Sequence, residues 1–244
     1  MKRLGLVLAF GLIAGGCSGG SDLTVSVIST INTIGSGQQR ILVELRDSEG
    51  VPTTLPDGPV ATLRDENGSP LGTDTGELVW VVPDQQPAYA FVFDIPGAET
   101  YQLTVDGGEL GEGGPAGFVT VERAVQVNVD EEVPPVGGQP VPGPAIVVFA
   151  SPRHCPAQSC LPMLEQAQAA ADSAPAVRLV GVEVFANPEA EDEGDLVLSP
   201  DVEAWRLPSQ PWLYVIDEQG RVSALFEGAV SDAELRAAIE GLDT

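Results

Sequence analysis

The sequence predicts two domains, an all-β sandwich followed by an α/β domain in which strands alternate with helices. Its length of 244 residues suits two domains of about 100–200 residues each. Residues 23–129 contain short runs in which apolar and polar residues alternate, whereas continuous apolar runs and a helical pattern begin at residue 145. The proline-rich stretch 130–144 separates these two patterns, which places the domain boundary there.

The N-terminus has the pattern of a targeting segment. Lys2 and Arg3 precede the apolar run Leu4–Ile13, which is too short for a membrane-spanning helix of about 20 residues. Small residues then lead to Cys17, and the stretch resembles the bacterial lipobox, with Ala14 where leucine is usual. The resemblance implies a signal peptide (1–16), a lipidated Cys17 and a tether (17–22), and therefore an extracytoplasmic protein anchored to the bacterial cell membrane. An ordinary secretory signal with an incidental cysteine is the alternative.

The charge of the chain excludes one class of function. Its formal net charge is −25, and removal of residues 1–16 would take away two basic residues and leave −27 with no lysine. Such a surface repels phosphate backbones, so nucleic acid is not an expected partner. It also repels anionic lipid headgroups, so membrane attachment would depend on the lipid. We expect a monomer.

Seven strand runs predict an immunoglobulin-like sandwich over residues 23–129. Turn signals such as Asp57-Gly58 and Asp106-Gly107-Gly108 separate them. Ile41, Val43 and Leu45 should share the buried face of one strand. The runs are Leu23–Ile28, Gln39–Arg46, Pro59–Arg64, Glu77–Val82, Ala88–Ile95, Thr100–Val105 and Gly117–Val129.

The stretch 130–144 contains five prolines and predicts a semi-rigid spacer, so that the two domains fold separately. In residues 145–244 we expect the order strand, helix, strand, short helix, strand, strand, helix. Ser231 and Glu234 form a capping box that starts the last helix. The other expected elements are Ala145–Ala150, Ser159–Asp172, Val177–Phe185, Asp201–Leu207, Trp212–Ile216 and Val222–Phe226.

Two cysteines remain once Cys17 is set aside. Cys155 and Cys160 form an even pair in an exported chain, which favours a disulfide. Both lie where the first strand of the second domain passes into its first helix.

This placement resembles the thioredoxin fold over residues 145–243, because that family carries its redox cysteines at the same junction. Family members also have a cis-proline before the third strand, facing the cysteines, and Pro211 matches it better than Pro208 does. The resemblance implies that Cys155 is the attacking thiol and Cys160 the resolving one.

Two departures from the family pattern bear on the chemistry. Four residues separate the cysteines instead of two, so a disulfide can close only if Pro156-Ala157-Gln158 forms an extra turn. His154 stands where the family has a tryptophan. An imidazolium there would lower the pKa of Cys155, and a loop residue without a role is the alternative.

These observations leave two functions open. The first is thiol–disulfide exchange on exported proteins, whose thiols or disulfides would be the partners, so the chain is a candidate oxidoreductase. The second is a non-catalytic binding module with a structural disulfide. We expect no cofactor and no metal, because copper sites of the related Cys-x-x-x-Cys type need a further histidine and none follows His154.

Overall fold

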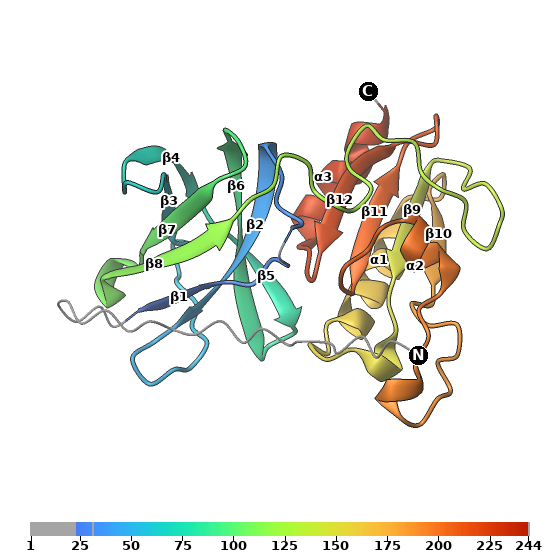
Figure 1. Ribbon diagram of the computed structural model, residues 1–244, viewed down its shortest axis with the longest axis horizontal. Helices are drawn as coiled ribbons and strands as arrows, with labels where there is room; N and C mark the ends of the chain where they lie inside the picture. The colour runs from blue at the N-terminus through green and yellow to red at the C-terminus, as the bar shows by residue number, and fades with distance from the viewer. Residues whose placement is uncertain (1–22, 31, 244) are drawn as a thin grey trace, which may run out of the picture.

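Eight strands between residues 24 and 119 form two four-stranded antiparallel sheets in the computed structural model, which describes residues 23–30 and 32–243 (Figure 1). The sheet orders are β1-β2-β6-β5 and β4-β3-β7-β8. We call this unit the sandwich. Its strands are β1 (Thr24–Val27), β2 (Gly37–Arg46), β3 (Val60–Arg64), β4 (Pro70–Thr75), β5 (Glu77–Val82), β6 (Gln86–Ile95), β7 (Thr100–Asp106) and β8 (Glu112–Val119), with a 3-10 turn at Gly108–Leu110.

The sheet that contains β2 is covered on both faces. Ile41, Val43 and Leu45 lie in the core between the two sheets, which confirms the predicted alternation. Leu42 points to the opposite face and is also buried, together with Ala90 and other apolar residues of β5 and β6. Ala229 from the C-terminal part of the chain packs into that second cluster. One face of the sandwich is therefore a docking surface for the rest of the molecule.

A third sheet, ordered β10-β9-β11-β12, forms the centre of the C-terminal unit (residues 145–243). Helices α1 and α3 pack on one face around Met163 and Leu235, while α2 and Trp205 cover the other. Hydrogen bonds in both directions between Ser231 and Glu234 confirm the capping box. The elements are β9 (Ala145–Phe149), α1 (Cys160–Ser173), β10 (Arg178–Val182), α2 (Pro200–Ala204), β11 (Trp212–Ile216), β12 (Val222–Glu227) and α3 (Asp232–Glu240), with 3-10 turns at Pro152–His154, Glu193–Asp195 and Gly241–Asp243.

The predicted fold class is wrong in its second part. An α/β domain has mainly parallel strands with helices between them, but only the β9–β10 ladder of this sheet is parallel. Across the part of the chain that the structure describes, the protein is mostly β, with three four-stranded sheets and three short helices of 14, 5 and 9 residues. We therefore replace the expected α/β thioredoxin-like domain with a mostly β architecture.

Residues 130–144 are not a spacer. Val141 is buried in the core on the α2 side of the third sheet, and Val133 and Val136 pack against that core. The backbone N–H of Val133 donates to the carbonyl of Gly220 at 3.0 Å. Gly143 passes so close to the β11–β12 turn that a Cβ there would lie 1.7 Å from the carbonyl oxygen of Asp217. Apolar valines between the prolines thus fix this segment to the C-terminal unit.

Polar contacts connect the sandwich to the C-terminal unit. Arg40 on β2 forms a bidentate ion pair with Glu234 on α3, with Nε 2.6 Å from Oε1 and Nη2 2.9 Å from Oε2. Its Nη2 also donates to the carbonyl of Ala229. Its guanidinium also lies 5.4 Å from the ring centre of Phe226. A cavity of about 780 Å³ lies beside these contacts, with Arg40, Trp212 and Phe226 in its wall. The sandwich and the C-terminal unit therefore pack against each other, whereas the sequence predicted two domains that fold separately.

Candidate active site at the Cys155–Cys160 disulfide

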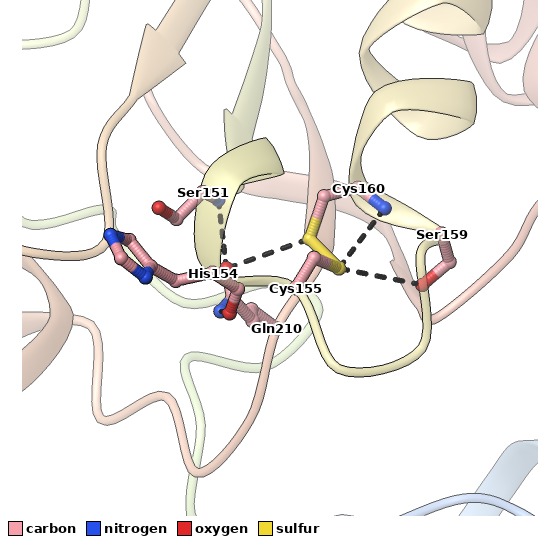
Figure 2. Close-up of a disulfide and its surroundings, with 6 residues drawn as sticks. All are labelled: Ser151, His154, Cys155, Ser159, Cys160 and Gln210. Atoms are coloured by element: carbon pink, nitrogen blue, oxygen red, sulfur yellow. Dashed lines mark hydrogen bonds between the residues drawn. A yellow bond between two sulfur atoms is a disulfide. The ribbon is translucent and has the colours of Figure 1, made fainter. Parts of the chain in front are cut away.

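A disulfide joins Cys155 and Cys160 between the end of β9 and the start of α1 (Figure 2). The Cα atoms are 6.0 Å apart. The intervening residues form the extra turn that the spacing requires, in which the N–H of Gln158 donates to the carbonyl of Cys155 and Gln158 has a positive φ of 57°. The predicted pairing and the predicted turn are both confirmed.

The two sulfur atoms have different surroundings. Cys160 is fully buried against Met163 and the strands of the third sheet, whereas Cys155 is partly exposed. The backbone N–H of Cys160 donates to Sγ of Cys155 at 3.2 Å, and Oγ of Ser159 lies 4.0 Å from the same sulfur. Because this N–H belongs to the first turn of the 14-residue helix α1, it would stabilise negative charge on Cys155 after reduction.

Gln210 is a site residue that the sequence interpretation missed. Its Oε1 accepts a hydrogen bond from the N–H of Ser151 at 2.7 Å, and its Nε2 donates to the carbonyl of His154 at 2.8 Å. The same Oε1 lies 3.5 Å from Sγ of Cys160 (Figure 2). One amide therefore connects the end of β9, the cysteine loop and the buried sulfur. The sequence signal that could have indicated it is its position directly before Pro211.

Pro211 takes the conformation expected of it. The Gln210–Pro211 peptide bond is cis, whereas Pro208, the weaker candidate, lies exposed three residues earlier. Pro211 is buried and precedes β11 directly, so Gln210 reaches the cysteines from the loop that leads into the strand next to β9.

The imidazole of His154 points away from both sulfur atoms (Figure 2). Its Nε2 lies 2.7 Å from the carbonyl oxygen of Pro188, and its ring meets Phe185 edge-on at 5.6 Å between ring centres. The group that contacts Cys155 is thus a helix N–H and not the imidazole, whose effect on Cys155 was one of the two alternatives for His154.

The predicted lipid anchor lies outside the described residues, and the described residues contain neither a membrane-spanning helix nor a metal-binding cluster. Cys17 and the predicted signal peptide belong to residues 1–22, which the structure does not describe. Within residues 23–30 and 32–243, no helix is long and apolar enough to cross a bilayer. The same residues contain no cluster of three or more His, Cys, Asp or Glu side chains arranged to hold a metal ion.

Comparison with known proteins gives structural likenesses but no match in sequence. No protein-family model and no curated protein matches the sequence. Among solved structures, the filamin domain of Lin-41 is similar, with 18% identity and a TM-score of 0.25, over 42% of this chain and 94% of the domain. The first unit of this chain is an immunoglobulin-like β-sandwich. Its two antiparallel sheets enclose one apolar core.

Proposed function

We propose that the protein carries out thiol–disulfide exchange on exported proteins through Cys155 and Cys160. The observation that supports this most is the asymmetry of the pair: Cys155 is a partly exposed residue beside the N-terminus of α1, and Cys160 is fully buried. An attacking thiolate needs access and stabilised charge, and Cys155 has both. A resolving thiol needs proximity to the first sulfur, which the disulfide itself provides for Cys160.

The reaction follows from these roles. In the reduced protein, the Cys155 thiolate attacks one sulfur of a substrate disulfide, a mixed disulfide forms, and the other substrate sulfur leaves as a thiolate. Cys160, once deprotonated, attacks Sγ of Cys155 and releases the second substrate thiolate. The substrate disulfide is thereby reduced by two electrons and the Cys155–Cys160 pair is oxidised. In the opposite direction, the same steps transfer the disulfide to a substrate dithiol.

The test combines a redox titration with single-cysteine variants. We expect the full chain to exchange disulfides with a model disulfide peptide, Cys155→Ser to abolish exchange, and Cys160→Ser to accumulate a mixed disulfide visible by mass spectrometry. Ser173→Ala, at an exposed position at the other end of α1, is the control and should retain exchange. A reduction potential below about −300 mV together with no turnover would instead identify a structural disulfide in a binding module.

The proposed place of action is outside the cytoplasm, with the chain held to the bacterial cell membrane by a lipid on Cys17. The supporting features are the basic start, the apolar run and the small residues before Cys17 in the sequence. The net charge of −25 opposes direct binding to anionic lipids, so the lipid would be the attachment.

The anchor can be tested separately from the chemistry. In bacteria that express the chain, we expect the wild-type protein in the membrane fraction and Cys17→Ser in the soluble fraction, because only the former can be acylated. Cys155→Ser is the control and should stay with the membrane. Equal distribution of wild-type and Cys17→Ser proteins would contradict the anchor.

A further inference from the structure

Glu227, the last residue of β12, lies where the sandwich meets the C-terminal unit. Figure 1 shows β12 as the strand of the third sheet beside the sandwich. The Glu227 carboxylate accepts hydrogen bonds from the backbone N–H and the hydroxyl of Thr30, with the N–H 3.2 Å from Oε2. The hydroxyl of Thr33 donates to the carbonyl of Thr30 at 2.6 Å and also lies 3.2 Å from Oε2 of Glu227. All three groups belong to the sandwich.

A fourth group links the same carboxylate to the disulfide site. Oγ of Ser209 donates to Oε1 of Glu227 at 2.8 Å and accepts from Nε1 of Trp212 at 3.0 Å. The Ser209 hydroxyl is therefore fixed by two hydrogen bonds, one to Glu227 and one from Trp212. The next residue is Gln210, whose Oε1 lies 3.5 Å from Sγ of Cys160.

We propose that Glu227 is a positioning residue for the redox pair, through which the sandwich holds Gln210 against Cys160. This inference rests on the proposed exchange function and assigns the sandwich a part in it. In the dithiol form, the Cys160 S–H donates to Oε1 of Gln210, whereas the disulfide has no proton to donate. A fixed Gln210 consequently stabilises the dithiol relative to the disulfide, and a loosened Gln210 does so less.

The consequence is a shift in a redox equilibrium. The disulfide and two glutathione thiols are in equilibrium with the dithiol and one glutathione disulfide, and loss of a hydrogen bond to the dithiol moves this equilibrium toward the protein disulfide. One net hydrogen bond corresponds to a change of roughly two- to tenfold in the equilibrium constant. A tenfold change equals about 30 mV for this two-electron couple.

The experiment measures that equilibrium constant for the full-length protein by alkylation and mass spectrometry, in glutathione buffers or in dithiothreitol if the pair is more reducing. We expect Glu227→Gln and Ser209→Ala to shift it in the same direction, toward the disulfide. Two controls should leave it unchanged: Glu218→Gln, an exposed acid in the β11–β12 turn, and Arg40→Gln, which breaks another contact between the two units.

Each outcome has a separate meaning. An unchanged constant in both Glu227→Gln and Ser209→Ala, or an equal shift in Arg40→Gln, would overturn the positioning role. Ser209→Ala also serves as the second variant if Glu227→Gln does not fold. Absence of substrate turnover would contradict the proposed function. The effect of Glu227 on the redox equilibrium could still be measured, because glutathione and dithiothreitol react with the disulfide without a protein substrate.

Discussion

At the scale of single residues, Gln210 contacts more of the candidate site than any property of a glutamine side chain would predict. Its position directly before Pro211 was the one sequence signal for it, and its partners Ser151 and His154 lie more than fifty positions away along the chain. Cys155 and Cys160, by contrast, were predictable, because cysteine chemistry and their place after an apolar strand both point to a disulfide. The contacts of Gln210 required the fold.

Replacement of Gln210 by methionine tests its structural contribution. Methionine has a similar length and no strong acceptor, so the fully buried Ser151 would keep an N–H without a hydrogen-bond partner. We expect the free energy of unfolding of the oxidised protein to fall by about 1–3 kcal/mol in urea titrations. Gln219→Met, in the exposed β11–β12 turn, should change it by less than about 0.5 kcal/mol. Equal stability of the two variants would show that the Ser151 bond contributes little.

At the scale of elements, the periodic segments were predictable and the irregular ones were not. The predicted strands at Glu77–Val82 and Trp212–Ile216 have the observed bounds, and β2 begins two residues before its predicted start. Helix α3 begins directly after Ser231, the first residue of the predicted capping box. The strand β4 was missed because its sequence is polar and exposed and contains Gly72. The predicted run Gly117–Val129 continued too far, since beyond Val119 the chain leaves the sheet and contacts the C-terminal unit.

The fold class is also an error at this scale. The order of strands and helices was read largely as observed, but element order does not fix how many ladders are parallel. That depends on which strand edges pair, and two of the three ladders of the third sheet are antiparallel. A resemblance built from element order, two cysteines, Pro211 and a capped last helix was too little to establish an α/β class.

At the scale of the whole molecule, apolar and polar contacts join the sandwich to the C-terminal unit. Ala229 fills an apolar cluster of the sandwich, and Glu234 pairs with Arg40. Glu131, just after the sandwich, receives Arg123 from the preceding segment and Arg206 from the C-terminal unit. A protein with a net charge of −25 thus places scarce arginines at the junction between its two parts.

The junction at Glu131 should make stability depend on pH. Partial burial opposes its ionisation, but hydrogen bonds from Arg123, Asn128 and Arg206 together hold the pKa of this carboxyl below its ordinary value of 4.5. A lowered pKa in the folded state means that the contribution is complete above pH 4.5 and is lost as the pH falls through the folded value. Glu131→Gln should therefore lower the free energy of unfolding at pH 7 by about 1 kcal/mol or less.

The measurement is thermal unfolding of wild-type and Glu131→Gln proteins between pH 7 and pH 3. We expect the difference between them to shrink toward zero at the acidic end. Glu132→Gln, an exposed neighbour, should match the wild-type protein throughout. A difference that stays constant down to pH 3 would mean that the charge of Glu131 is not its cause.

Local pattern was enough to predict most strands of the sandwich, the capped last helix, the cysteine pair and the candidate cis-proline. These features follow from periodicity, turn chemistry and the geometry of a disulfide, all of which act over a few residues. The fold class, the docking of residues 130–144, and the contacts of Gln210 and Glu227 became known only from the folded chain. Those features depend on which distant surfaces meet, and Thr30 and Glu227, separated by 197 positions, have no signal in the sequence that would pair them.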